Sequence, residues 1–219
     1  MRKDDSYARR VDVSRATPFR LAAVMLAAAL GAVGCGGEPS ASARSASEPR
    51  LRGAELPQAR PAPDFALRDQ DARTVRLSAL RGKVVLVTFL YTRCPDVCPL
   101  IADNLNQALR KLRGDRRFAR VLAVSVDPRG DTEAAARTYA RSHHLLPEFR
   151  YLIGTRRQLE PVWRAFHVAA VASDAEAVDH SAYIALIDRN GRERAHYDAQ
   201  VHASDVVADV RVLLRENRE

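Results

Sequence analysis

Apolar runs alternate with amphipathic stretches along most of the chain between residues 61 and 219. Three of these runs contain mainly β-branched and aliphatic residues, and they are long enough for strands but too short for most helices. They cover residues 84–91, 121–126 and 181–188. Because none of them has a polar face, they predict strands that are buried on both sides of a sheet.

Amphipathic segments with helical spacing lie between and after these runs. One apolar face is predicted over residues 100–112, where the apolar residues are three or four positions apart. Further helices are predicted over residues 134–144 and 156–166, and a last one begins at a Ser204 cap. This order of strands and helices favours an α/β sandwich, with a mixed central sheet flanked by helices.

Turn-forming residues predict two hairpins and a short strand. Residues 65–67 and 74–77 flank a polar, turn-rich segment, which predicts an N-terminal hairpin. Asn190-Gly191 predicts a tight turn from the third apolar run into residues 192–198. Residues 151–153 predict one further short strand.

The first 34 residues have the pattern of an export signal. A basic stretch ends at Arg20, and a 13-residue run without charge follows over residues 21–33. This run has the length of a signal-peptide core, whereas a spanning helix needs about 20 apolar residues. We therefore predict that residues 1–34 are a signal peptide and that the protein works in the cell envelope.

Cys35 follows Ala32-Val33-Gly34, and this segment resembles the lipobox of bacterial lipoproteins, whose cysteine is acylated. The alternative is that Cys35 is only a small residue at an ordinary cleavage site. The lipoprotein interpretation predicts a membrane anchor at Cys35, with the folded domain on the periplasmic, extracytoplasmic side.

Residues 36–60 are rich in glycine, alanine, serine and proline, and Leu51 and Leu56 are their only large aliphatic residues. Such a composition cannot bury a core, so it predicts a flexible spacer. The predicted organisation is a signal peptide over residues 1–34, lipid attachment and linker over 35–60, and one folded domain over 61–219.

Composition excludes several classes of protein. The chain has 219 residues, of which 47% are hydrophobic and 28% charged, as in ordinary globular proteins. Three cysteines are too few for a disulfide scaffold. The net charge is +8, but residues 1–34 contribute +3 of it. The remaining excess is modest and is not interleaved with aromatic residues, so we expect no nucleic-acid partner.

The candidate chemistry is concentrated in Cys94 and Cys98, which directly follow the first buried strand. Ligands of open α/β sheets collect at this end of the strands. The spacing places both sulfurs on one face of a helical turn, and a helix N-terminus favours thiolates, so one or both thiols are expected to ionise easily. The pair could instead be buried cysteines or a routine disulfide bond, although a bridge over three residues constrains the unfolded chain little.

Two kinds of chemistry suit such a pair. Thiol–disulfide exchange in thioredoxin-like enzymes uses two intervening residues and a later proline before a strand. This chain has three intervening residues and no proline after Pro161. Metal binding is the other choice, because two thiolates hold Cu(I) and one imidazole completes a trigonal site.

Six histidines are candidates for that imidazole: His143, His144, His167, His180, His196 and His202. Only His180 directly precedes a long apolar run, after a loop over residues 169–179 that could carry it to the cysteines. Its neighbour Asp179 is suited to orienting the imidazole ring from outside the ligand sphere.

Three ordered motifs resemble those of the Sco/SenC family, copper-binding assembly factors of cytochrome c oxidase. They are Cys94-Pro-Asp-Val-Cys98-Pro, Ser125-Val-Asp-Pro-x-x-Asp131-Thr, and Asp179-His180 before the third run. The resemblance implies a thioredoxin-like fold, a membrane-tethered domain and copper held by Cys94, Cys98 and His180. Relatives often have an arginine directly before the Asp-Thr of the second motif, where this chain has Gly130.

The leading hypothesis is therefore a copper metallochaperone, with thiol–disulfide reductase activity left open, that supplies the dinuclear CuA site in the copper-bearing subunit of cytochrome c oxidase. A copper donor and a thiol reductant are expected to act before it. The alternative is a membrane-tethered thiol–disulfide oxidoreductase that uses Cys94 and Cys98 on exported partners. A peroxidase of related fold and a structural zinc site are more remote alternatives.

Overall fold

The computed structural model describes residues 50–168 and 183–216. The predictions for Cys35, Asp179 and His180 lie outside these residues. The strands are β1 (Ala54–Pro61), β2 (Ala66–Asp69), β3 (Thr74–Arg76), β4 (Val84–Leu90), β5 (Ala119–Ser125), β6 (Phe149–Ile153), β7 (Ile184–Ile187) and β8 (Arg192–Tyr197). The helices are α1 (Val97–Leu112), α2 (Glu133–Ser142), α3 (Arg156–Ala165) and α4 (Ala203–Glu216), with short 3₁₀ helices η1 (Leu77–Leu80) and η2 (Arg113–Phe118).

The strands form one mixed sheet in the order β1-β8-β7-β4-β5-β6-β2-β3. The pairs β4–β5 and β5–β6 are parallel, and all other pairs are antiparallel. The predicted hairpins are both present, as β2–β3 and β7–β8. The second turns at Gly191, whose φ of +71° lies in the left-handed region that favours glycine. The mixed central sheet is thus confirmed.

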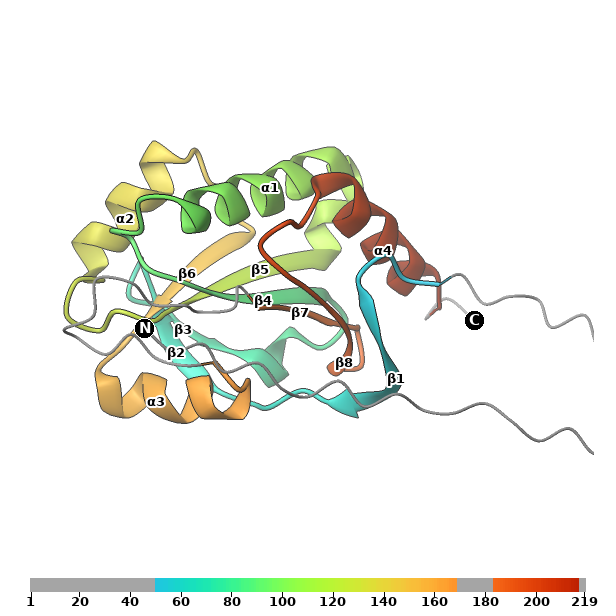
Figure 1. Cartoon of the computed structure of the whole chain (residues 1–219), viewed down its shortest axis with the longest axis horizontal. Helices are drawn as coiled ribbons and strands as arrows, with labels where there is room; N and C mark the ends of the chain where they lie inside the picture. Colours follow the sequence, from blue (N-terminus) through green and yellow to red (C-terminus); the bar gives the residue numbers. More distant parts are fainter. Residues whose placement is uncertain (1–49, 169–182, 217–219) are drawn as a thin grey trace, which may run out of the picture. The chain divides into compact units, whose positions relative to one another are not determined.

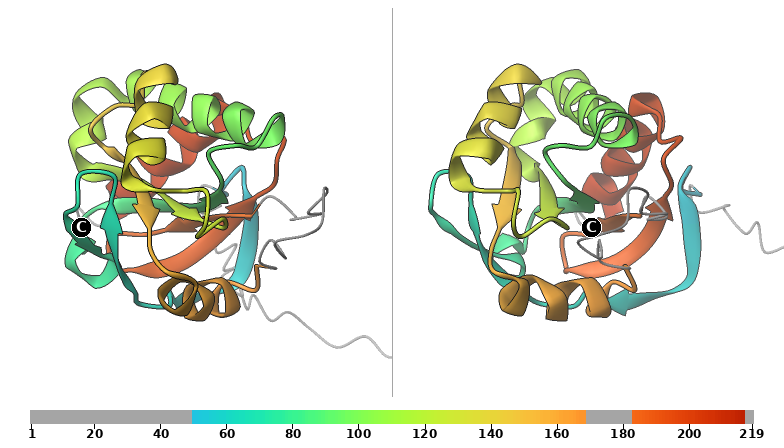
Figure 2. Two further views of the ribbon diagram at one scale, coloured as in Figure 1. Left: turned by 90° about the vertical axis from the view of Figure 1, so that its left-hand side faces the viewer. Right: turned by 60° about the vertical axis from the view of Figure 1, so that its left-hand side comes forward.

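Helices cover both faces of the sheet. Figures 1 and 2 show α1, α2 and α4 on one face and α3 on the other. Side chains of β4 alternate between two cores, since Leu86 and Leu90 pack toward α1 whereas Val87 and Phe89 pack toward α3. All seven residues of β4 are buried, as the continuous apolar run predicts. None of the helices in the described part is long and apolar enough to cross a membrane.

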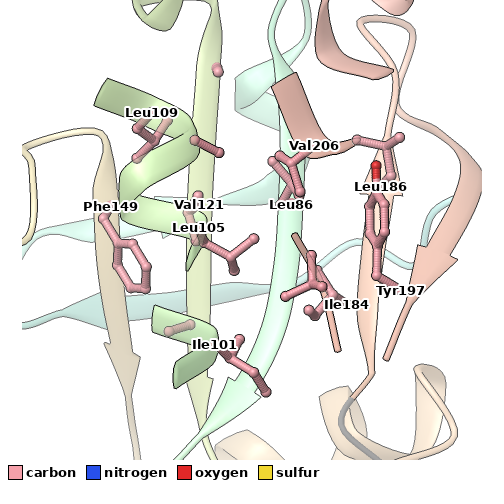
Figure 3. Close-up of a cluster of buried hydrophobic side chains, with 14 of the residues drawn as sticks. Leu86, Ile101, Leu105, Leu109, Val121, Phe149, Ile184, Leu186, Tyr197 and Val206 are labelled. Atoms are coloured by element: carbon pink, nitrogen blue, oxygen red, sulfur yellow. The ribbon is translucent and has the colours of Figure 1, made fainter. Parts of the chain in front are cut away.

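Helix α1 positions the cysteine segment over the centre of the sheet. Its residues Ile101, Leu105 and Leu109 point onto the sheet, near Leu86 and Val121 (Figure 3). The helix begins at Val97, three residues before the predicted start, so Cys98 belongs to its first turn. The buried apolar face therefore fixes the orientation of the turn that carries Cys98.

The prediction of a flexible spacer up to residue 60 is wrong for its last part. Residues 54–61 form β1, an edge strand that pairs with β8, and Leu51 is buried. The buried carboxylate of Asp209 in α4 accepts hydrogen bonds from the backbone N–H groups of Arg52 (2.8 Å) and Gly53 (2.9 Å). The strand is held by backbone pairing and by this distant carboxylate, so the residues need no apolar pattern of their own.

Two helix starts also differ from the predictions. Helix α4 begins at Ala203, so Ser204 lies inside its first turn rather than at its cap. Helix α2 is capped by Thr132, whose side chain accepts a hydrogen bond from the N–H of Ala135 (3.1 Å). Helix α2 therefore begins at Glu133 rather than at residue 134, and the neighbouring Asp131 accepts hydrogen bonds from Thr92 instead.

Candidate metal centre

Cys94 and Cys98 meet at the junction between β4 and α1. The chain turns directly after β4, where the N–H of Cys94 donates to the carbonyl of Tyr91 (3.2 Å). The N–H of Cys98 then donates to the Sγ of Cys94 (3.3 Å). Cys94 lies before the helix and only Cys98 lies in it, so a turn outside the helix brings the sulfurs together, not one helical turn as predicted. Both residues are free thiols.

The pair is buried, with 7% of Cys94 and 1% of Cys98 exposed. Burial raises the pKa of the Cys98 thiol, and its hydrogen bond with Cys94 and the charge of that neighbour raise it further. Of the expectation that one or both thiols ionise easily, the case of both is therefore wrong, because Cys98 does not. Burial together with Cys94 also raises the pKa of Tyr91 to about 12, so this phenol stays protonated beside the pair.

The carboxylate of Asp131 braces the loop before Cys94. Its Oδ1 accepts hydrogen bonds from the N–H (2.9 Å) and the Oγ1 (2.7 Å) of Thr92. Its Oδ2 accepts from Ser125 Oγ (2.6 Å) and from Tyr151 OH (3.0 Å). Burial raises the pKa of Asp131, while these hydrogen bonds act in the opposite direction. Asp131 thus ties the β4–α1 loop to β5 and β6.

Gly130 leaves room for an ion pair at the rim of the site. Arg93 Nη2 lies 2.6 Å from Asp127 Oδ2, and Asp127 Oδ1 accepts from the N–H of Gly130 (2.9 Å). A Cβ at position 130 would lie 2.3 Å from the Asp127 carboxylate and 2.7 Å from the Arg93 guanidinium. A side chain there would displace the pair, so the glycine allows Arg93 to place its guanidinium against Asp127.

Tyr139 of α2 carries a buried hydroxyl that has no hydrogen-bond partner within the described residues. Its ring packs against Tyr151 (5.5 Å between centroids) and His143 (4.3 Å). Burial raises the pKa of Tyr139, and the charges of Cys98 and Asp103 raise it further. Tyr139 belongs to the same buried cluster as Cys94 and Cys98, although the sequence offered only its place on the apolar face of a helix as a signal.

The histidines within the described part do not complete a metal site. No group of three or more histidine, cysteine or acidic side chains gathers there in a way that suits a metal ion. His143 pairs with Asp103, with Nδ1 3.0 Å from Oδ1. Of the predicted ligands, the structure brings Cys94 and Cys98 together, while His180 and Asp179 lie outside the described residues.

The protein has a mixed sheet with helices on both faces, and two free cysteines lie at the edge where the parallel strands end. These features define a thioredoxin-like protein with a dithiol site. The sequence profile of the SCO1/SenC family matches residues 53–215. This protein belongs to the SCO1/SenC family, and the predicted membership is confirmed.

Three similar proteins support the fold or the family. A SCO2-like protein of Rickettsia prowazekii is 31% identical over 149 residues, covering 65% of this chain and 72% of that protein. The structure of Bradyrhizobium japonicum ScoI with copper bound is 31% identical, has a TM-score of 0.62, and is matched over 70% of this chain and 99% of its own.

The third is BsSco, described as a member of the Sco family of cytochrome c oxidase assembly proteins with a disulfide switch. It is 23% identical, with a TM-score of 0.63 over 74% of this chain and 97% of its own, and it supports the fold alone. Together with the ScoI structure it confirms the predicted thioredoxin-like fold.

Proposed function

We propose that this protein binds one copper ion through Cys94, Cys98 and His180, and delivers it to the CuA site of cytochrome c oxidase during assembly. The observation that carries the proposal is the pair of free thiols that meet at the start of α1, in a chain whose relatives include a copper-bound ScoI. Two thiolates suit a soft ion such as Cu(I), and an imidazole completes a trigonal site that also accepts Cu(II).

Copper is cargo in this proposal, so the site must release it. Binding displaces the proton of each thiol. Because burial and Cys94 raise the pKa of Cys98, copper affinity increases as the pH rises. Cys94 is the more exposed of the two cysteines, so an incoming ligand of the recipient meets its sulfur first. In this scheme Asp179 orients the ring of His180.

The site of action follows from the N-terminal segment. We propose that residues 1–34 direct export, and that a lipid on Cys35 anchors the mature chain to a membrane of the bacterial envelope. Exported compartments are oxidising, so a thiol reductant must keep Cys94 and Cys98 reduced before a copper donor can load them.

Copper stoichiometry and absorption spectra of the reduced protein test the proposal. The wild type is expected to hold one copper ion per chain, with a thiolate-to-copper charge-transfer band in the Cu(II) form. Cys94→Ser and Cys98→Ser should lose this band, and His180→Ala should bind copper much more weakly. His202→Ala, a change at an exposed histidine of the same chain, serves as the control and should bind like the wild type. Unchanged affinity in all three site variants would show that the proposal is wrong.

A thiol–disulfide oxidoreductase is the second candidate, and the free, adjacent thiols of Cys94 and Cys98 favour it. Such an enzyme needs both cysteines but has little need of His180. Assembly of cytochrome c oxidase in cells that carry His180→Ala separates the two functions. Full assembly without copper binding supports the oxidoreductase, whereas loss of both supports the metallochaperone.

A further inference from the structure

Seven cations gather where α1 ends and where β4 and β5 begin. They belong to the end of α1, to η2 and to the residues next to the two strands: Lys83, Arg110, Lys111, Arg113, Arg116, Arg117 and Arg120. We call them the basic patch. The Nζ of Lys83 donates to the carbonyl of Arg117 (3.1 Å), which ties the strand start to η2. Arg110 and Lys111 in the last turn of α1 are exposed, and the first five residues of η2 are exposed or half-buried, so these cations face solvent.

Acidic residues do not balance the basic patch. Asp115 of η2 and Glu148, which pairs with Arg116 (3.4 Å), are acidic neighbours of the helix-end cations, and Asp64 and Asp188 line the same hollow as Lys83. Asp115 and Glu148 together reduce the seven positive charges of the patch to +5. The chain after residue 34 has 29 basic and 24 acidic residues, so this local excess is as large as that of the whole chain after residue 34. The position at a helix C-terminus explains Arg110 and Lys111 but not the other cations.

The local electrostatics agree with an accumulation of like charge. Burial lowers the pKa of Lys83, and the charge of Arg120 lowers it further. Burial also lowers the pKa of Arg120. Burial is the larger cause in both residues, and the charge of Arg120 adds to it only for Lys83. An anionic surface placed against the patch would favour the charged form of these side chains.

The composition of the patch fits lipid headgroups better than a protein. Stable protein interfaces have a core of apolar and aromatic side chains. Within the described part, Leu100 is the one large hydrophobic residue that is strongly exposed, and it lies at the other end of α1. Phe118, the last residue of η2, is half-buried beneath the guanidinium of Arg117 (4.7 Å). Flexible cations without an apolar centre suit a diffuse anionic surface.

We propose that the basic patch docks on anionic phospholipid headgroups. It lies at the edge of the sheet where β4 and β5 begin, whereas Cys94 follows the opposite end of β4. A strand of this length spans roughly 20 Å at about 3.3 Å per residue. Docking through the patch therefore directs the edge of the sheet that carries Cys94 away from the bilayer. This edge then faces a partner domain that lies outside the membrane. This orientation rests on the proposed function, but lipid binding does not.

Vesicle flotation of the reduced, copper-free, full-length chain tests lipid docking. The measured quantity is the partition coefficient on vesicles containing phosphatidylglycerol, divided by that on phosphatidylcholine vesicles. Lys111→Gln/Arg113→Gln/Arg117→Gln should lower this ratio roughly tenfold or more, and 0.5 M salt should weaken the wild type in the same direction. The apolar run over residues 21–33 is present in every variant, so its contribution cancels.

The control variant removes three exposed arginines outside the patch, Arg129→Gln/Arg157→Gln/Arg164→Gln, and should keep the wild-type ratio. Thermal unfolding verifies that both variants are folded. Equal ratios for the patch variant and the wild type overturn the proposal. A wild type that prefers an acidic protein such as ovalbumin, and ignores both kinds of vesicle, also overturns it. Copper binding does not enter the measurement, so the result is independent of the metallochaperone function.

Discussion

Asp131 and the cysteine pair show how single residues define the site. The carboxylate of Asp131 is 4% exposed and accepts four hydrogen bonds, two of them from Thr92. Thr132 provides the cap of α2, and Asp131 supports the loop that presents Cys94. The cysteines were identified from their position after a buried strand, but their burial and the raised pKa of Cys98 depend on packing that the sequence does not reveal.

Replacing Asp131 should destabilise the fold in a graded manner. Asp131→Ala leaves the N–H of Thr92 without its buried partner and is expected to lower the free energy of unfolding by about 2–4 kcal/mol. Asp131→Asn should cost about 1 kcal/mol, because its oxygen still accepts from Thr92 while the hydroxyls of Ser125 and Tyr151 can turn to accept from its amide. Urea denaturation measures both values, and an asparagine variant that is as unstable as the alanine variant would contradict this account of the contacts.

At the scale of elements, α1 could be predicted from the sequence, whereas β1 could not. The apolar face of α1 was visible in the sequence because it packs directly on the sheet, with Ile101, Leu105 and Leu109 pointing toward it (Figure 3). Strand β1 could not be recognised in the sequence, because most of its side chains are exposed and it has no apolar pattern. Pairing with β8 and the hydrogen bonds to Asp209 hold it, and Asp209 lies more than 150 residues away.

Asp209→Ala should release the N-terminal end of β1. The variant leaves two backbone N–H groups and the hydroxyl of Tyr197, which donates to Asp209 over 2.6 Å, without a buried acceptor. The expected loss is about 2–4 kcal/mol of unfolding free energy. Hydrogen exchange over residues 51–61 should accelerate more than exchange in β4. Arg211→Ala, at an exposed position of α4, is the control, and unchanged exchange in β1 of the Asp209 variant would refute the role assigned to this carboxylate.

At the scale of the whole molecule, one sheet joins two cores. Its central strands send alternate side chains to the α1 side and the α3 side, so neither core can lose its packing without disturbing the strands that it shares with the other. The same central strands separate two functional edges, the cysteine pair where β4 ends and the basic patch where it begins.

The two cores should therefore unfold together. Leu105→Ala on one face and Leu159→Ala on the other are each expected to cost about 2–5 kcal/mol. Each should shift a single transition, seen equally by far-ultraviolet circular dichroism and by the fluorescence of Trp163, which lies in the α3 core. Leu100→Ala, at a residue that is 56% exposed, is the matched control and should cost little. Separate transitions for the two probes would exclude a single cooperative unit.

The sequence by itself determined the class of fold, the central strands, the helices and the cysteine pair, because period, capping residues and turn residues are local properties. Through its motifs it also indicated the SCO1/SenC family. Only the tertiary structure decided that residues 54–61 join the sheet, that Asp131 braces the cysteine loop, that Cys98 resists ionisation, and that the cations of α1 and η2 form one patch. These features arise between residues that are distant in the chain, where burial and hydrogen-bond partners depend on how the elements pack.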